Sequence, residues 1–415
     1  KIILLLAAFW LLLADAYSAT YYSRRNGNWN SRFTWSTSDH EEGPASTTPG
    51  PGDIVYIGGH TITVTANAAC SELRFSDGYT SGTLNVDTGY ALTVSGAVTV
   101  ISSDDSNTSS AFTGGGELTC SSMSVGTYVS PGKSRTTTLF SDIAALNVTG
   151  NVVIHSNYSY WFWNYSNNAS LTINSGAVVV GGSVVTTNEN SSNASSLTLG
   201  NGAPYLAIGG ATPFNLDGIG TSSITLNGTG ATVDYNRNGS QNVFNTGYTN
   251  LTLSGSGVKT IPAGLPLSGM LSMEGTATVL GSAPSYGSAS TIRYRGSASQ
   301  NTGVELIPVF NGDGGLIIDN PSGVNLTSSL TLNSGLNLAS GSFNVGGNTL
   351  TLNGPPITLT SGNMATTSAS SLVFGGSSAG VYIPSGVTSL NNLTIDNTGG
   401  VTLNSNITLA SGGIL

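Results

Sequence analysis

The chain has 415 residues, of which only 7 % are charged, and its formal net charge is −9 at pH 7. Ordinary globular chains carry about 25 % charged residues, and this acidic balance without a basic stripe excludes nucleic acid and anionic membranes as partners bound through charge. Gly, Ser, Thr and Asn are abundant, but the regular alternation of Leu, Val and Ile supplies a continuous apolar face and argues against a disordered linker.

Residues 1–18 predict a secretory signal peptide. Lys1 is a minimal positive region, Ile2–Leu13 is the apolar region, and Ala16-Tyr17-Ser18 places small residues before a cleavage site at Ala19. The apolar run is shorter than the roughly 20 residues of a comfortable membrane span, although a retained anchor is the alternative. We therefore expect an extracellular protein at the cell surface.

Residues 19–66 predict an N-terminal cap. They combine aromatic, basic and acidic side chains and then a Pro-Gly-Pro-Gly turn that leads into an apolar strand. The open end of a repeat array exposes core and strand edges unless a different segment covers it. The aromatic and charged residues of this segment are Tyr21, Tyr22, Arg24, Arg25, Trp29, Arg32, Phe33, Trp35, Asp39, Glu41 and Glu42.

Residues 67–230 predict irregular solenoid coils with inserts. Short pieces such as Leu92-Thr-Val and Leu171-Thr-Ile place two apolar side chains on one face and Thr on the other. Gly, Asn and Ser follow most of these pieces and supply the corners. Three strands and three corners make one coil of a right-handed parallel β-helix, which is the all-β fold that we expect. A string of antiparallel sandwiches is the alternative.

Residues 231–415 predict solenoid coils built of longer repeats. LIIDNPSGVNLTSSLTLNSGLNL at 316–338 and LTIDNTGGVTLNSNITLASGGIL at 393–415 align without a gap, and the later copy stops in mid-repeat. Such strands cannot bury their apolar faces alone, so the repeats must stack. Three similar pieces open larger units, at 231–235, 290–294 and 370–374. The interrupted repeat indicates part of a longer protein.

Cys70 and Cys120 stand in matching contexts, each three positions before an apolar residue in an alternating stretch. Export permits a disulfide. Matching contexts, however, indicate the same slot on coils that lie two apart, about 10 Å from each other, which is too far for a bridge. We predict two buried free thiols.

The titratable residues form no catalytic or metal-binding motif, so we expect no enzyme, no metal and no cofactor. β-helix enzymes that cut polysaccharides gather two or three carboxylates on one face. The adjacent carboxylates here, Glu41-Glu42 and Asp104-Asp105, lie in polar stretches and are interpreted as solvated turns. Asp313 is interpreted as a plain corner rather than a calcium turn. The histidines, at 40, 60 and 155, are scattered.

The aromatic cluster at 155–165 is the candidate glycan-binding site. Trp161, Trp163 and Tyr165 share strand parity and would form one flat outward platform, on which sugar rings stack. The alternative is a bulky insert whose rings cover its own core.

The segments YYSRRNGNWNSRFTWSTSDHEEG, PGPGDIVYIGGHTITVTANAACSELRF and the later NLTLSGSGVKT together resemble the large β-solenoid surface proteins of Bacteroidota exported by the type IX secretion system. The resemblance covers essentially the whole mature chain. The pattern from Trp29 and Trp35 to Asp53 and Ile57 is also similar to the eight-glycine domain that opens some β-helical ectodomains. The resemblance implies an exported surface protein with solenoid architecture and names no activity. Such proteins usually end in a C-terminal sorting domain, which this sequence does not contain.

These observations predict a secreted structural stalk or adhesin that presents a Thr/Asn/Ser-rich face for multivalent contact. Its expected partners are cell-surface or environmental glycans, and self-association into rods or filaments is a further expectation. The first alternative is a polysaccharide-binding or polysaccharide-cleaving β-helix. A second alternative is ice binding by ordered rows of outward Thr.

Overall fold

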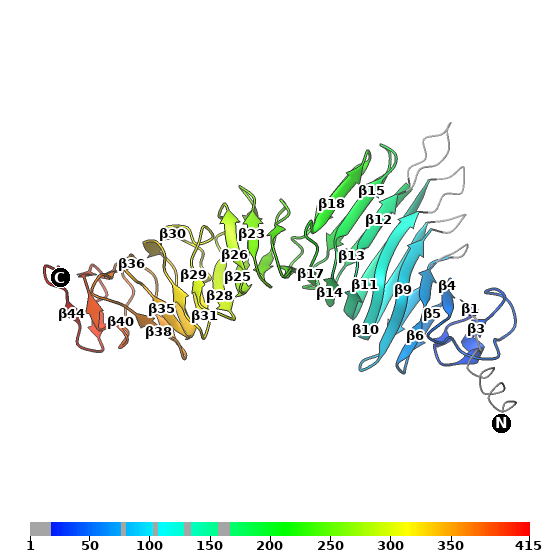
Figure 1. Ribbon diagram of the computed structural model, residues 1–415, viewed down its shortest axis with the longest axis horizontal. Helices are drawn as coiled ribbons and strands as arrows, with labels where there is room; N and C mark the ends of the chain where they lie inside the picture. Colours follow the sequence, from blue (N-terminus) through cyan, green and yellow to red (C-terminus); the bar gives the residue numbers. More distant parts are fainter. Residues whose placement is uncertain (1–17, 76–79, 103–106, 128–133, 157–166) are drawn as a thin grey trace, which may run out of the picture. The chain divides into compact units, whose positions relative to one another are not determined.

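The computed structural model describes residues 18–75, 80–102, 107–127, 134–156 and 167–415 (Figure 1). The protein is an all-β solenoid of parallel strands, as the alternation predicts, and the described residues hold a single helical piece, the 3-10 turn η1 (Arg32–Thr34). The chain divides into two compact units. The first comprises Lys1–Gly176, Val185–Leu197 and Leu216–Ser223, and the second comprises Ala177–Val184, Thr198–Asn215 and Ile224–Leu415.

The first unit stacks its strands in parallel, coil upon coil. Figure 1 shows β9, β10 and β11 lying side by side in this stack. The strands that lie wholly or mostly in the unit are β1 (Thr20–Ser23), β2 (Gly27–Asn28), β3 (Trp35–Ser36), β4 (Ile54–Ile57), β5 (Thr61–Val64), β6 (Ala68–Cys70), β7 (Glu72–Phe75), β8 (Thr83–Val86), β9 (Ala91–Ile101), β10 (Thr108–Thr127), β11 (Arg135–Val148), β12 (Val152–Ser156), β13 (Asn167–Ile173), β15 (Val184–Asn188), β16 (Ala194–Leu199), β18 (Phe214–Gly218) and β19 (Thr221–Thr225).

The segment expected to be a cap already contributes coils to the stack. Strand β1 pairs in parallel with β4, and β4 pairs in the same way with β7. The other edge of β1 pairs with β3, which runs antiparallel to it, with Ser23 opposite Trp35. An unpaired strand edge is a template for aggregation, so β3 protects the first strand of the stack. Trp35 is fully buried behind this pairing.

Cys70 and Cys120 are both free and buried, which confirms the prediction from their contexts. Val94 is the register partner of each of them, so the two cysteines occupy one slot on coils that lie two apart. Burial raises the pKa of both thiols to about 12. They therefore behave as small apolar side chains of the core.

The second unit is built mostly of short strands. They are β14 (Ala177–Val180), β17 (Tyr205–Ile208), β20 (Thr232–Tyr235), β21 (Gln241–Asn242), β22 (Asn250–Leu253), β23 (Val258–Ile261), β24 (Pro266–Leu267), β25 (Met270–Gly275), β26 (Thr278–Gly281), β27 (Ser285–Tyr286), β28 (Thr291–Gly296), β29 (Gln300–Asn301), β30 (Val309–Phe310), β31 (Gly315–Asp319), β32 (Val324–Asn325), β33 (Leu330–Leu332), β34 (Leu336–Ser340), β35 (Ser342–Asn344), β36 (Thr349–Leu352), β37 (Thr358–Leu359), β38 (Asn363–Ala365), β39 (Ser371–Phe374), β40 (Val381–Ile383), β41 (Ser389–Leu390), β42 (Asn392–Ile395), β43 (Val401–Leu403) and β44 (Thr408–Leu409).

Three strands and three corners form a coil in the second unit, as predicted. One sheet contains β28, β31, β34 and β37, a second contains β29, β32, β35 and β38, and a third contains β30, β33, β36, β39 and β42. Every pairing among them is parallel and joins a strand to its counterpart one coil away. Inward Leu and Phe side chains of the three sheets form one apolar core.

The similar sequence pieces do not all occupy the same sheet. The openers at 231–235 and 290–294 form β20 and β28, which belong to one sheet, whereas the opener at 370–374 forms β39 in another. Likewise Leu316 lies on β31, and its copy Leu393 lies on β42 of the third sheet. All three sheets accept the same alternating pattern, so sequence similarity between repeats does not decide which side of the coil a strand occupies.

Candidate functional site

The residues predicted to contact glycans, Trp161, Trp163 and Tyr165, lie outside the described residues, as do Asp104 and Asp105. Glu41, Glu42 and Asp313 are exposed, in keeping with their interpretation as turn residues. The platform expected of the aromatic cluster therefore stays a prediction.

The structure brings two of the three histidines together in the cap. The Oγ atom of Ser23 lies 3.3 Å from Nδ1 of His40 and 3.2 Å from Nδ1 of His60. The same hydroxyl donates to the carbonyl of Gly58 and accepts from its N–H, so it joins β1 to the corner after β4. Burial lowers the pKa of His60. Over the described residues, no group of three or more His, Cys, Asp and Glu is placed to hold a metal.

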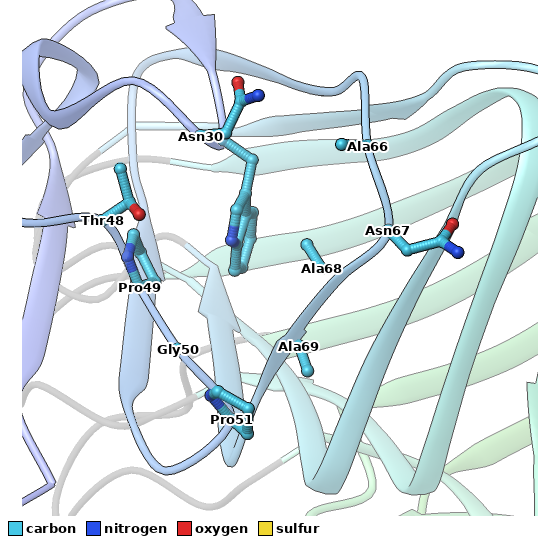
Figure 2. Close-up of a pocket in the computed structure, with 10 residues that line it drawn as sticks. Asn30, Thr48, Pro49, Gly50, Pro51, Ala66, Asn67, Ala68 and Ala69 are labelled. Carbon is cyan, nitrogen blue, oxygen red and sulfur yellow. The ribbon is translucent and has the colours of Figure 1, made fainter.

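A pocket of about 410 Å³ is lined by residues of the cap and of β6 (Figure 2). Its walls come from the Pro-Gly-Pro turn, from the small side chains before and within β6, and from the segment after β2. Figure 2 shows Pro49 and Pro51 on one side and Ala68 and Ala69 facing them. The lining residues are Trp29, Asn30, Thr48, Pro49, Gly50, Pro51, Ala66, Asn67, Ala68 and Ala69, and none of them is charged.

Trp29 lines this pocket, and its indole carries a buried hydrogen-bond donor that is not used. Trp29 is only 3 % exposed and packs edge-on against Trp35, with ring centroids 5.2 Å apart. Its Nε1 atom is buried and has no hydrogen-bond partner, although a buried polar group without a partner costs about 1–3 kcal/mol. Apolar walls with a few amide groups suit a neutral polar ligand such as a sugar ring.

The outer faces of the coils carry columns of short neutral side chains. In the second sheet of the second unit, Asn325 donates to the side-chain oxygen of Asn301 at 2.9 Å, and Asn344 donates to that of Asn325 at 2.8 Å. A second column repeats this pattern, because Asn353 donates to the side-chain oxygen of Asn333 at 2.8 Å. Each amide thus joins one coil to the next and leaves a regular polar surface.

Polar and charged side chains form a column on the second unit, on the strand face opposite the apolar core. Asp234, Thr252, Ser272 and Arg293 are successive register partners on β20, β22, β25 and β28. We call these four residues the polar column. Arg293 donates to the hydroxyl of Ser272 at 3.1 Å and forms an ion pair of 3.0 Å with Glu274.

Both carboxylate oxygens of Asp234 already accept hydrogen bonds. The hydroxyl of Tyr205 donates to one of its oxygens and that of Ser254 to the other, both at 2.6 Å, and the residue is 6 % exposed. Burial raises the pKa of Asp234, and Glu274 adds to the rise, while the two hydroxyl donors oppose it. A raised pKa is a property of general acids. Here both oxygens are engaged and nearly buried, so the arrangement joins coils and is not poised to transfer a proton.

The polar column was missed in the sequence, although a signal for it exists. Asp234 and Arg293 occupy the same place in two openers, Thr-Val-Asp-Tyr and Thr-Ile-Arg-Tyr. Once the two openers are assigned to one sheet, their third residues are expected to lie in one column of side chains. Asp234 and Arg293 lie three coils apart, so their place in one column cannot be inferred without the register.

A buried lysine gives the second unit a predicted pH dependence. Lys259 is fully buried, and its Nζ atom donates to Arg237 O at 2.8 Å, Gly239 O at 3.2 Å and Gln241 Oε1 at 2.9 Å. Burial lowers the pKa of this amine from 10.5 to about 8, although Asp234 opposes the fall. Between these two values the unfolded chain binds more protons than the folded chain, so the free energy of unfolding rises with pH.

We expect the stability of the second unit to rise by about 2 kcal/mol between pH 8 and pH 10. In Lys259→Met, which keeps a long unbranched side chain, the rise should be absent. Urea unfolding at four pH values checks this expectation. If the free energy of unfolding changes equally with pH in the unchanged protein and in Lys259→Met, the Lys259 amine has an ordinary pKa. Above pH 10 the buried tyrosines, whose pKa values burial raises, reverse the trend.

The described residues include no helix that is both long and apolar enough to cross a bilayer. Comparison of the chain with protein-family models, with curated proteins and with solved structures finds no match.

Proposed function

We propose that this protein is an exported structural stalk or adhesin of the cell surface, in which stacked coils present a neutral polar face for multivalent contact. The observation that carries the proposal is the set of in-register polar columns on the outer faces of the coils. Thr63, Asn85 and Thr113 form one such column in the first unit, and the asparagine columns form others in the second.

Stacking supports a mechanical role. Each strand bonds to its counterpart on the neighbouring coils, so load is shared by parallel hydrogen bonds along the array. Each outer column repeats neutral hydroxyl or amide groups at the coil spacing of about 4.8 Å. Weak contacts that repeat along a surface strengthen binding together, because each contact that forms raises the effective concentration of the next. A partner with its own repeating groups, such as a polysaccharide, would gain most from this arrangement.

Polysaccharide binding is the second candidate function, and the cap pocket favours it. The pocket is lined by the Trp29 side chain and by the amide side chains of Asn30 and Asn67, without a charged group. Cleavage gains no comparable support. Asp234 is the described carboxylate with a raised pKa, and both of its oxygens are occupied by hydroxyl donors.

A glycan array combined with an assay for new reducing ends tests the proposal. The full chain is applied to immobilised polysaccharides and, in parallel, to cells that lack the protein. Retention on cells or glycans without release of reducing ends is the expected result. Release of reducing ends would replace the proposal with an enzymatic function, and the absence of retention on every surface would remove the adhesive role.

The aromatic cluster supplies a specific prediction for the same assay. If Trp161 and Trp163 form an outward platform, their rings lie about 6.5 to 7 Å apart along a strand and contact neighbouring sugar rings. Replacing both with Ala should then abolish retention and leave the melting temperature unchanged. A double variant that melts many degrees lower would instead place the rings in the core. A stable variant with normal retention would move the adhesive surface elsewhere, with the cap pocket as the next candidate.

A further inference from the structure

A buried carboxylate in the second unit has no cationic partner. Glu305 lies between β29 and β30 and is only 1 % exposed. Its Oε1 atom accepts hydrogen bonds from the hydroxyl of Tyr294 at 2.6 Å and from the N–H of Gly303 at 2.8 Å. Its Oε2 atom is buried and has no partner at all. No Lys, Arg or His among the described residues forms an ion pair with it.

The corresponding position in an earlier coil is neutral. Tyr235 occupies the place of Tyr294 in the same sheet, and its hydroxyl is satisfied by Tyr248 at 2.6 Å and by the N–H of Phe244 at 2.9 Å. Closing this part of the core therefore needs no carboxylate. Burying an unpaired charge is expensive, and its presence in so charge-poor a chain points to a ligand and not to packing.

A cavity of about 270 Å³ adjoins the carboxylate, and Glu305 is one of its lining residues. Met273, Ala277 and Tyr294 add apolar and aromatic surface to the lining, while Gln300 and Thr302 add polar atoms. The Oε1 atom of Gln300 is already occupied, because it accepts from Gly296 N at 2.8 Å and from Asn320 Nδ2 at 2.9 Å. The carboxylate is therefore the strongest unused acceptor of the cavity.

We propose that this cavity binds a small organic ammonium ion, with Glu305 Oε2 as its acceptor and the ring of Tyr294 beside it. A charge-assisted hydrogen bond would satisfy the unpartnered oxygen, and an ammonium group is attracted by an aromatic ring. A metal ion fits less well. Calcium takes six to eight oxygen ligands, whereas this cavity offers one carboxylate and is larger than an ion requires. The site is independent of the proposed adhesive role.

The absence of a side chain at Gly303 leaves space beside Glu305 Oε2. A Cβ atom on this exposed glycine would lie 2.6 Å from Glu305 Oε2, closer than real Cβ contacts. Its backbone does not require glycine, because its φ lies outside the left-handed region. A side chain at this position would push against the carboxylate oxygen that the ligand needs.

Calorimetric titration of the full chain with matched probes tests the site. We expect 2-aminoethanol, a cation at neutral pH, to bind and 1,2-ethanediol, its neutral counterpart, not to bind. Glu305→Gln keeps the shape of the side chain and should weaken 2-aminoethanol binding by about tenfold or more. A second pair of probes, glucosamine and glucose, distinguishes two possible sources of the ammonium group, amino sugars and amines of headgroup size. Tighter binding of glucosamine than of 2-aminoethanol assigns the site to amino sugars, and the reverse order assigns it to amines of headgroup size.

Three results would overturn the proposal: no binding of either amine, equal binding of the charged and neutral partners, or unchanged amine binding in a folded Glu305→Gln variant. Circular dichroism establishes whether that variant folds. If it does not fold, Gly303→Ala decides, since it retains the carboxylate and covers Oε2. Loss of amine binding in folded Gly303→Ala supports the site, and unchanged binding contradicts it.

Discussion

Replacing Leu332 with Asp is expected to destabilise the second unit by about 4 kcal/mol or more, whereas Thr331→Asp should change its stability by less than about 1 kcal/mol. Leu332 is fully buried and stacks between its register partners Phe310 and Leu352. An Asp there loses the apolar contacts and also buries an unpaired charge. Thr331 points to the other face of the same strand, where its partners are Val309 and Thr351.

Urea unfolding of the two variants, followed by circular dichroism, measures the difference. The adjacent positions share the same strand and the same coil, so each variant controls for the other. Equal losses in the midpoint of unfolding would mean that the strand register is wrong. A greater loss for Thr331→Asp would mean that the two faces are exchanged.

Replacing Trp35 with Ala is expected to cost about 3–5 kcal/mol in the cap, which is the usual loss for a fully buried tryptophan. Trp35 is 0 % exposed, and its Nε1 atom donates to the carbonyl of Trp29 at 2.7 Å. Its loss removes the contact with the Trp29 ring and weakens β3, the strand that protects the edge of β1. We therefore expect local opening of the cap as well as a lower melting temperature.

Phe33→Ala is the matched control, because Phe33 lies two positions away and is 45 % exposed, with the guanidinium of Arg32 over its ring. It should cost about 1 kcal/mol or less. Limited proteolysis followed by mass spectrometry locates the opening. Cleavage within residues 19–66 should accelerate in Trp35→Ala and not in Phe33→Ala. Similar rates in both variants would show that the tryptophan does not hold the cap closed.

The amino-acid sequence was sufficient for the class of fold and for the direction of individual side chains. Successive side chains of a strand point to opposite faces, so an apolar–Thr–apolar piece such as Leu330-Thr-Leu332 already indicates which residues point into the core. The matching contexts of Cys70 and Cys120 placed them in one slot of different coils, and the register bears this out. Both conclusions depend only on local periodicity, which the chain carries in every coil.

The tertiary structure alone decided which strands share a sheet and which polar groups meet. The three sides of a coil accept the same pattern, and coils differ in length, so the opener at 370–374 forms β39 in a sheet different from that of β20 and β28. The juxtaposition of Asp234 with Ser254 and the unpartnered Oε2 of Glu305 beside a cavity likewise depend on the stacking of separate coils. Periodicity determines the inside and the outside of a strand, whereas the neighbours of a side chain across coils depend on the length of every turn between them.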